Sequence, residues 1–558
     1  MLDITDIGRA AGTLYWVFLA GAAIGGAFGV LALRVKSPAI RWALIADMAI
    51  VAFLLIAFSA LFIHHAVLKG YAYSGDEAST LYQGQIFAQG DLWKEPLPAE
   101  LQRSFPRHHV VVQEDREYSK YPPLTALAIA AALAFNHAEW ANIAVTMAAF
   151  LLLLWCARLL SGGWRVPLLT AIPFLFATTV IFHAASYFSH PLSMCLILAT
   201  VIALILNERS RDNGGRRRYA FIIGLLVGLL LLARPYDALL TAAAIVCYHL
   251  WDLAAGPDRR ALLRRWAARW GEWLALIGGG AIGAFLFLGY QKLYTGSFFL
   301  SPYRIYDAGG EVMAELTLTA DQLFGRGLSE ITVHWLGQQA AWSSAAVMVL
   351  AVIYFSVRSR KMRRSERIVL LLPLLFIVGY AFHPFFGGDS FGARYYYPVI
   401  WCWFYAAAAL IQYLARRFTQ GHGAFLYLLF AVAVTVPFHQ QLIDRCNGVS
   451  AVVAERFSLN RAIEERIPTH ERAVVLLGRT PQYDGPFYVR HDPLLRDRIV
   501  YGCYRTGFPL TDDFQRAFPG RSYYKADFDR SAGVFRILPL RSPIHQKRTT
   551  PPIGGILP

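Results

Sequence analysis

Residues 221–250 read FIIGLLVGLLLLARPYDALLTAAAIVCYHL, an apolar run with a single interruption. The run is too long for one membrane crossing, because a transmembrane helix needs only about 20 apolar residues. The interruption, Ala233–Asp237, contains a proline and two charged side chains, which end a helix and avoid lipid. The stretch therefore predicts two spans, 219–234 and 236–251, joined by a tight turn.

The rest of the chain continues this pattern. Of its 558 residues, 56% are hydrophobic and only 16% are charged, and the mean hydropathy is +0.40, which is too apolar for soluble domains. The other apolar segments long enough to cross are 12–33, 42–68, 141–159, 166–182, 190–207, 272–293, 341–357, 367–383, 396–415 and 423–440. We therefore predict an all-α polytopic membrane protein with about twelve transmembrane helices.

The net charge of +16 comes from Lys and Arg in the loops between apolar runs. Every second loop is basic, and the longest examples are 208–218, 258–269 and 358–367. Basic loops face the cytoplasm, which predicts a plasma (inner) membrane protein whose loop 69–140 and both termini are extracytoplasmic. This placement argues against a nucleic-acid partner, and no phosphate-binding loop or dinucleotide motif is present.

The boundaries of the expected domains follow from hydropathy. Residues 1–441 form the transmembrane domain, and its first apolar stretch lacks a cleavage site and should remain as an anchor. Within the outer loop, 122–135 is too short to span, so we expect an interfacial or re-entrant helix. Residues 442–541 alternate charged and strand-like segments, which predicts a small extracytoplasmic α/β or α+β domain, and 542–558 is expected to be flexible.

Two acidic residues, Asp76 and Glu77, follow the second span at its outer end. Carboxylates so close to lipid need a structural or chemical reason. Ser74 and Glu77 fit a capping box, which explains the pair as the start of a helix. That box leaves Asp76 free for chemistry, so both explanations stay open.

Further motifs appear in a fixed order along the chain. They are Asp76-Glu77, GDLW at 90–93, KYPPL at 120–124, CARLL at 156–160, GLLVGLLLLARPYDALL at 224–240, YTGSFFLSPYRIY at 294–306 and FGARYYYP at 391–398. Together they resemble the GT-C type polyprenyl-phosphate-sugar glycosyltransferases, which include protein O-mannosyltransferases and lipid A aminoarabinose transferases. The resemblance covers about residues 40–415, and this chain carries an extra helix before it.

The resemblance implies a sugar transferase with an extracytoplasmic site, a polyprenyl-phosphate-linked sugar donor, and a lipid, glycan or protein acceptor. It assigns Asp76 as the general base, with inversion at the sugar, and Glu77 as an orienting or capping residue. Cations stabilise a leaving phosphate, and the candidates are Lys120, Arg234 and Arg394. The residues expected to line the substrate are Tyr121, His183, His190, Tyr303 and Tyr395.

Each candidate cation has a structural alternative. Lys120 could extend to lipid phosphates without a catalytic role, and Arg234 could form an ion pair with Asp237. Arg394 lies among aromatic residues and could be an interfacial anchor. We expect the acid and the cations to share one pocket.

A metal site is a weaker possibility. His183 and His190, with Asp76 or His383, could bind a divalent cation, but their spacing is unspecific and we do not favour a metal or any other cofactor.

Two other functions remain open. Twelve spans could belong to a transporter or flippase of lipid-linked glycans, although few charges lie within the spans. A glycan polymerase or ligase would use the later outer loop, 294–340.

Overall fold

A computed structural model describes residues 4–102, 105, 109–255, 269–308, 325, 327–359, 362–381, 383, 390–418, 420–478, 497–503, 516–529, 534–540 and 553–556. The chain divides into two compact units. The first contains Met1–His64, Pro122–Thr125 and Glu139–Asn447, and the second contains His65–Tyr121, Ala126–Ala138 and Gly448–Pro558.

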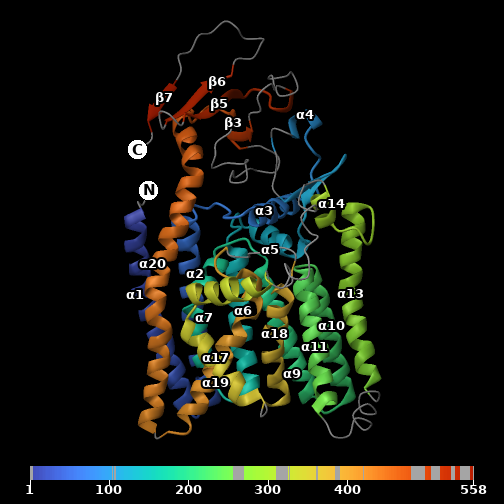
Figure 1. The fold of residues 1–558 in the computed structure, drawn as a ribbon, viewed down its shortest axis with the longest axis vertical. Helices are drawn as coiled ribbons and strands as arrows, with labels where there is room; N and C mark the ends of the chain where they lie inside the picture. The colour runs from blue at the N-terminus through green and yellow to red at the C-terminus, as the bar shows by residue number, and fades with distance from the viewer. Residues whose placement is uncertain are drawn as a thin grey trace. The chain divides into compact units, whose positions relative to one another are not determined.

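The first unit is helical (Figure 1). Its elements are α1 (Ile4–Arg34), α2 (Pro38–Phe62), α6 (Trp140–Ser161), α7 (Arg165–Leu175), α8 (Thr178–Ala184), α9 (His190–Arg209), α10 (Asn213–Leu231), α11 (Pro235–Ala255), α13 (Trp270–Thr295), α14 (Pro302–Ala308), η3 (Glu330–Gly337), α16 (Gln338–Trp342), α17 (Ala345–Arg358), η5 (Arg364–Glu366), α18 (Arg367–Ala381), η6 (Arg394–Val399), α19 (Ile400–Ala415) and α20 (Gln420–Arg466). The π-helix η1 (Ile63–Val67) continues α2, and the last residues of α20 belong to the second unit.

The protein is a multi-pass membrane protein. Among the described residues, seven helices are long and apolar enough to cross, or up to nine if two bent helix pairs each count as one span. A helix also lies at each of the remaining expected positions, as α10, α11 and α18. That these three cross the membrane, which the count of twelve requires, stays a prediction.

One expected span, 166–182, is bent. It consists of α7 and α8, which meet at an angle of 71°. Pro173 lies inside α7, where it removes a backbone donor and weakens the helix near this break. Because of the bend, α8 does not continue in the direction of α7. Helix α8 is buried, so its polar side chains lie in the interior of the unit.

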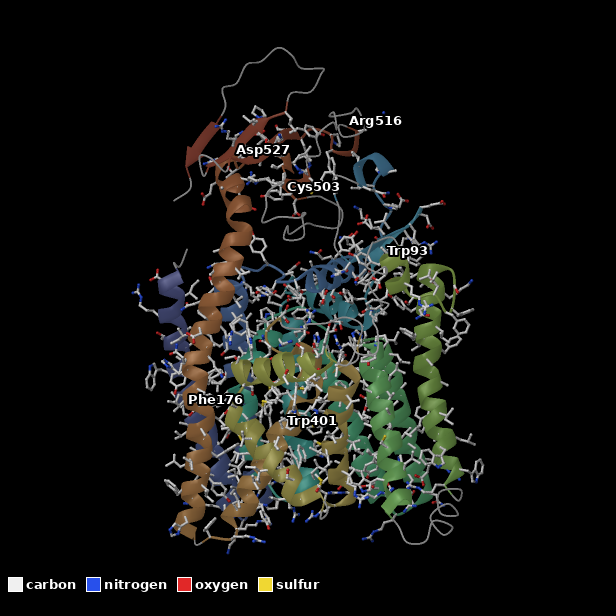
Figure 2. The ribbon with its side chains drawn as sticks, viewed as in Figure 1. Trp93, Phe176, Trp401, Cys503, Arg516 and Asp527 are labelled. Carbon is white, nitrogen blue, oxygen red and sulfur yellow. The ribbon has the colours of Figure 1, made fainter. Side chains whose placement is uncertain are left out.

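Helix α19 provides the centre of the first unit. Nearly all of its residues from Ile400 to Leu410 are buried, and Trp401 is fully enclosed (Figure 2). Phe150, Phe174 and Phe404 bring rings from α6, α7 and α19 together. A helix that is apolar on all sides belongs inside a bundle, because each face then has a neighbour.

Helices α10 and α13 lie side by side and pack closely (Figure 1). Gly224 and Gly228 on α10 face Gly279 and Gly283 on α13, and a Cβ on Gly279 would lie 2.1 Å from the Phe221 carbonyl oxygen. Small residues allow helices to approach in lipid, where apolar burial gives little driving force. These glycines therefore allow α10 and α13 to pack closely.

Replacing Gly279 with valine should separate these helices and destabilise the protein by about 1–3 kcal/mol. The neighbouring Gly278 is the matched control, because a Cβ there meets nothing within 4 Å. Thermal unfolding of both variants in detergent checks the prediction. A Gly279→Val midpoint no lower than that of Gly278→Val would contradict the packing.

The second unit combines short helices with two sheets. It contains α3 (Gly75–Ala88), α4 (Ala99–Gln102), the hairpin β1 (Val110–Val112) and β2 (Glu117–Ser119), most of α5 (Pro123–Leu133), β3 (Ala473–Leu477), β4 (Ile499–Cys503), β5 (Ser522–Asp529), β6 (Val534–Pro539) and β7 (Ile553–Ile556). The strand order of the larger sheet is β4-β3-β5-β6-β7, with parallel pairs around β3 and antiparallel pairs after β5. The C-terminal mixed sheet is thus confirmed.

The second unit combines the outer loop, which was expected in the transmembrane domain, with the C-terminal segment. The outer loop and the C-terminal segment share a core, because Leu101 and Phe105 pack with Val474, Leu476 and Val500. Apolar residues of a short loop helix thereby cover one face of the sheet. The segment 553–556, within the tail expected to be flexible, forms β7 and pairs with β6.

Two smaller features concern α5 and the cysteines. The apolar stretch 122–135 forms α5, a helix of 11 residues that is too short to span, as predicted. All six cysteines are free, including Cys446 and Cys503.

Candidate functional site

Asp76 lies in the first turn of α3, in the second unit. Ser74 caps this helix: its hydroxyl accepts from the Glu77 backbone N–H, and the Glu77 carboxylate accepts from the Ser74 backbone N–H at 3.2 Å. The predicted capping box is confirmed, and Glu77 is fully buried. Glu77 therefore has a structural role as a cap, while the Asp76 side chain remains 26% exposed.

Two side chains from the hairpin region hold the Asp76 carboxylate. The Tyr121 hydroxyl donates to Asp76 Oδ1 at 2.6 Å, and His109 Nε2 lies 3.0 Å from the same oxygen. Hydrogen bonds to an ionised group are the stronger kind and also orient it. A carboxylate that is oriented and partly exposed can accept a proton from a bound hydroxyl group.

His109 is a site residue that the sequence analysis missed. Its backbone is in the left-handed region, with φ +57°, and its carbonyl oxygen accepts from the Ser79 hydroxyl at 2.7 Å and the Lys120 N–H at 2.9 Å. These bonds fix a strained residue so that its ring reaches Asp76. The only sequence signal was a histidine directly before a β-branched run.

Lys120 is adjacent to this carboxylate site along the chain. It is buried, with 7% exposure, and its ammonium group lies 5.6 Å from the centre of the Tyr121 ring. A cation over an aromatic face is attracted to it. The structure thus brings Asp76, Tyr121 and Lys120, all named from the sequence, into one part of the second unit.

Replacing Tyr121 with phenylalanine should remove the strongest orienting bond to Asp76. If Asp76 is the base, we expect kcat/KM for transfer to fall by about tenfold, since a hydrogen bond to a charged group contributes roughly 1.5–3 kcal/mol. The matched control is Tyr118→Phe, because the Tyr118 hydroxyl donates to Gln113 instead, at 3.2 Å. Burial raises the pKa of Tyr118 to about 12, so that hydroxyl stays neutral. Equal effects of the two variants would contradict the role of Tyr121.

The first unit holds a second polar cluster, around Arg234 and Asp237. Arg234 lies between α10 and α11, at the predicted turn, and its Nε donates to Asp237 Oδ2 at 2.7 Å. Its other nitrogens donate to Ser189 at 3.3 Å and Tyr380 at 3.1 Å. The fully buried Asp237 also accepts from the Ser193 hydroxyl at 2.5 Å and from Tyr380. The ion pair considered for Arg234 is therefore formed.

Tyr395 connects this ion pair to the second candidate cation. Its ring stacks on Tyr380, with centroids 4.8 Å apart, and lies 6.0 Å from the Arg234 guanidinium. The Arg394 guanidinium lies 5.5 Å from the same ring and 4.9 Å from the ring of Phe188. Arg234 and Arg394, two candidate phosphate ligands from distant segments of the chain, therefore both lie near the ring of Tyr395.

The two histidines lie beside these cations but not in a loop. His183 is on α8 and His190 begins α9, and both are buried, with ring centroids 5.5 Å apart. His183 Nδ1 lies 2.8 Å from the Thr179 carbonyl oxygen and its ring stacks on Tyr397, whereas neither ring nitrogen of His190 has a hydrogen-bond partner among the described residues. The segment 185–189 between these helices is not helical, and its first four residues are buried.

Tyr303 and His383 are the remaining residues named from the sequence. Tyr303 lies on α14 and is partly buried. His383 contacts the rings of Tyr236 and Tyr395. Within the described ranges, no three His, Cys, Asp or Glu side chains gather as metal ligands.

The named residues thus form two groups. Arg234, Arg394, Tyr395, His183, His190 and Tyr303 belong to the first unit, and Asp76, Glu77, Lys120 and Tyr121 belong to the second. Each group is described within its own unit, so the expectation that the acid shares a pocket with Arg234 and Arg394 stays a prediction. Asp237, Tyr380 and Ser193, which were not predicted as site residues, complete the first group.

Solved structures of the same fold are known. The chain is similar to ArnT from Cupriavidus metallidurans bound to undecaprenyl phosphate, with a TM-score of 0.55 and 11% identity over 89% of this chain and 99% of that chain. The apo state of the same protein has a TM-score of 0.52 and 13% identity over 87% of this chain and 94% of that chain. The oligosaccharyltransferase of Archaeoglobus fulgidus in complex with Zn and sulfate has a TM-score of 0.48 and 12% identity over 85% of this chain and 67% of that chain.

The likeness to the two ArnT structures defines the class of fold. No protein-family model matches the chain, and no curated protein matches it. The fold is GT-C-like: a mostly helical multi-pass membrane protein with a small mixed sheet near its C-terminus. The resemblance carried by the sequence motifs is confirmed as a likeness of fold.

Proposed function

We propose that this protein is a glycosyltransferase that moves a sugar from a polyprenyl-phosphate donor to a lipid, glycan or protein acceptor. We place the reaction at the extracytoplasmic face of the plasma membrane, with inversion at the sugar. The observation that carries the proposal is a partly exposed Asp76 carboxylate, oriented by Tyr121 and His109, on a fold shared with a protein solved with undecaprenyl phosphate.

The chemistry needs one base and fixed positive charge. A lipid phosphate is already a good leaving group, so an acceptor hydroxyl can displace it at the anomeric carbon once its proton is removed. Asp76 takes that proton, and the bond from the anomeric carbon to the phosphate oxygen breaks as the new glycosidic bond forms. Negative charge grows on the phosphate in this step, so nearby cations stabilise the transition state more than the ground state.

Among the cations, the surroundings favour Arg394 as the principal phosphate ligand. The nitrogens of Arg234 already donate to Asp237, Ser189 and Tyr380, and Asp237 neutralises its charge. The Arg394 guanidinium lies over two aromatic rings, which orient its plane. In the proposed site, Arg234 positions Tyr395 and thereby Arg394, and Lys120 contributes a further cation.

Purified protein incubated with a panel of polyprenyl-phosphate sugars and envelope extracts as acceptors tests this proposal. We expect one donor in the panel to be consumed, with release of free polyprenyl phosphate detected by mass spectrometry. Arg394→Gln should slow this release about 100-fold, as removal of one oxyanion-stabilising donor does. The control Arg304→Gln changes an exposed arginine on α14. No release from any donor, or equal rates for both variants, would count against the assignment.

A further inference from the structure

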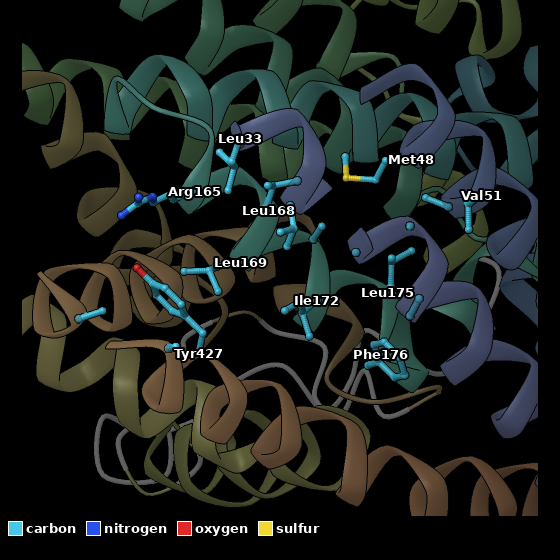
Figure 3. A pocket seen from close by; sticks show the side chains of 18 of the residues that line it. Leu33, Met48, Val51, Arg165, Leu168, Leu169, Ile172, Leu175, Phe176 and Tyr427 are labelled. Carbon is cyan, nitrogen blue, oxygen red and sulfur yellow. The ribbon is translucent and has the colours of Figure 1, made fainter. Parts of the chain in front are cut away.

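The first unit contains an apolar, partly open chamber of about 800 Å³ between its helices (Figure 3). Helices α1, α2, α7 and α20 supply its walls, among them Val30, Val51, Leu168 and Leu175. Among the residues that the structure describes, no Asp or Glu lines this chamber. Its size falls in the range of ligand pockets, and its walls suit hydrocarbon.

A second, smaller chamber of about 330 Å³ adjoins it. Leu33, Arg165 and Arg416 line both chambers, so the two lie side by side. The smaller chamber is polar, and Arg41 and Arg158 add two further positive charges to it. In the part of the chain that the structure describes, no carboxylate forms an ion pair with any of these four arginines.

Buried donors without acceptors point to an anionic ligand in the smaller chamber. Gln412 is 4% exposed; its Oε1 accepts from the Tyr427 hydroxyl at 2.8 Å, while its Nε2 has no partner within the described residues. Arg41 Nε is likewise buried without a partner in the described ranges. A buried donor left unsatisfied costs about 1–3 kcal/mol, so such groups usually have a ligand or water.

The start of α7 adds further donors to the same chamber. Residues Gly163–Val166 line it, and the N-cap position of α7, Trp164, makes no side-chain capping bond. The first backbone N–H groups of a helix are free donors at the positive end of its dipole. Oxygen atoms of a phosphate would satisfy them together with Gln412 and the arginines.

We propose that these adjoining chambers bind one anionic glycerophospholipid, with its phosphate in the arginine chamber and an acyl chain in the apolar chamber. A free phosphate would leave the apolar chamber empty. A zwitterionic lipid would bring a second, positive group to a chamber that holds four arginines and no acid. Basic pockets between membrane helices on the cytoplasmic side are where anionic headgroups bind. This site is separate from the residues assigned to sugar transfer.

Two glycines allow each chamber to be blocked without a clash. A Cβ added at Gly26, in the apolar chamber, or at Gly163, in the arginine chamber, would meet nothing within 4 Å. Gly26→Leu should therefore fill the acyl site, and Gly163→Asp should place a negative charge beside the arginines. Gly278→Leu is the matched control, because its Cβ position is also open and it lines neither chamber.

The experiment is a titration of delipidated, purified full-length protein with lipid, followed by native mass spectrometry. We expect phosphatidylglycerol to bind with one-site saturation and phosphatidylcholine to bind far more weakly. Gly26→Leu and Gly163→Asp should each weaken the binding of phosphatidylglycerol at least tenfold, and Gly278→Leu should leave this binding unchanged. Arg165→Gln with Arg416→Gln should weaken this binding by about thirtyfold, since each basic group contributes roughly fivefold. The pair Arg211→Gln with Arg218→Gln, which lines neither chamber, should have no such effect.

Four outcomes would overturn the proposal. They are equal binding of both phospholipids, equal occupancy by inorganic phosphate alone, displacement of phosphatidylglycerol by an equimolar amount of undecaprenyl phosphate, and unchanged binding in both chamber variants. The third outcome would assign the chambers to the carrier lipid instead. Thermal unfolding of each variant without lipid verifies that loss of binding does not reflect loss of the fold.

Discussion

Replacing Asp76 with asparagine is expected to slow sugar transfer by about 10²–10⁴-fold, the usual contribution of a general base. The amide keeps the size of the side chain and can still accept from Tyr121, which donates to Asp76 Oδ1 at 2.6 Å. It cannot take the acceptor proton. The fold should be retained, because the cap of α3 depends on Ser74 and Glu77.

The measurement is single-turnover release of polyprenyl phosphate, which separates chemistry from binding. Asp91→Asn is the matched control, since Asp91 is an exposed acid just after α3 in the same unit. We expect the donor to bind Asp76→Asn as tightly as it binds the original protein. Undiminished transfer by a folded Asp76→Asn variant would mean that the base is another residue.

Replacing Asp237 with alanine is expected to lower the free energy of unfolding by about 3–5 kcal/mol. The carboxylate is fully buried and accepts from Arg234, Ser193 and Tyr380. Its removal leaves a buried guanidinium without its counter-ion and two hydroxyls without their acceptor. Thermal unfolding in detergent, with the concentration of protein held constant, measures the loss.

The double variant Arg234→Leu with Asp237→Leu distinguishes a structural from a catalytic role of this pair. Much of the stability should return, because removing both charges also removes their desolvation cost. If transfer stays slow in a stable double variant, Arg234 contributes to the reaction through Tyr395. A single Asp237→Ala variant with unchanged stability would show that the buried pair is not important for the fold.

Local features of this chain were predictable because they depend on neighbouring residues. The cap at Ser74, the turn at Arg234 and the close glycines of α13 each follow from a short stretch of sequence. The short helix α5 was predictable from the length of its apolar run. These features position the candidate residues within each element, and the sequence therefore indicated most of them.

Contacts between distant segments were not predictable from one sequence. His109 reaches Asp76 only through a left-handed backbone and a hairpin whose register places Val110 opposite Ser119. Tyr380 meets Asp237 across 143 positions of the chain, and no local pattern encodes that pairing. The bend between α7 and α8 was likewise not predictable, since hydropathy alone does not distinguish a broken span from a straight one.

The most direct test of the proposed function is a comparison of carrier lipids in cells with and without this protein. Polyprenyl phosphates and their sugar-linked forms are extracted and identified by mass spectrometry, with the Asp76→Asn variant as a third strain. We predict that one sugar-linked polyprenyl phosphate accumulates both without the protein and with the variant, and returns to its normal level with the original chain. Identical carrier-lipid profiles in all strains would contradict the proposal that the chain consumes such a donor.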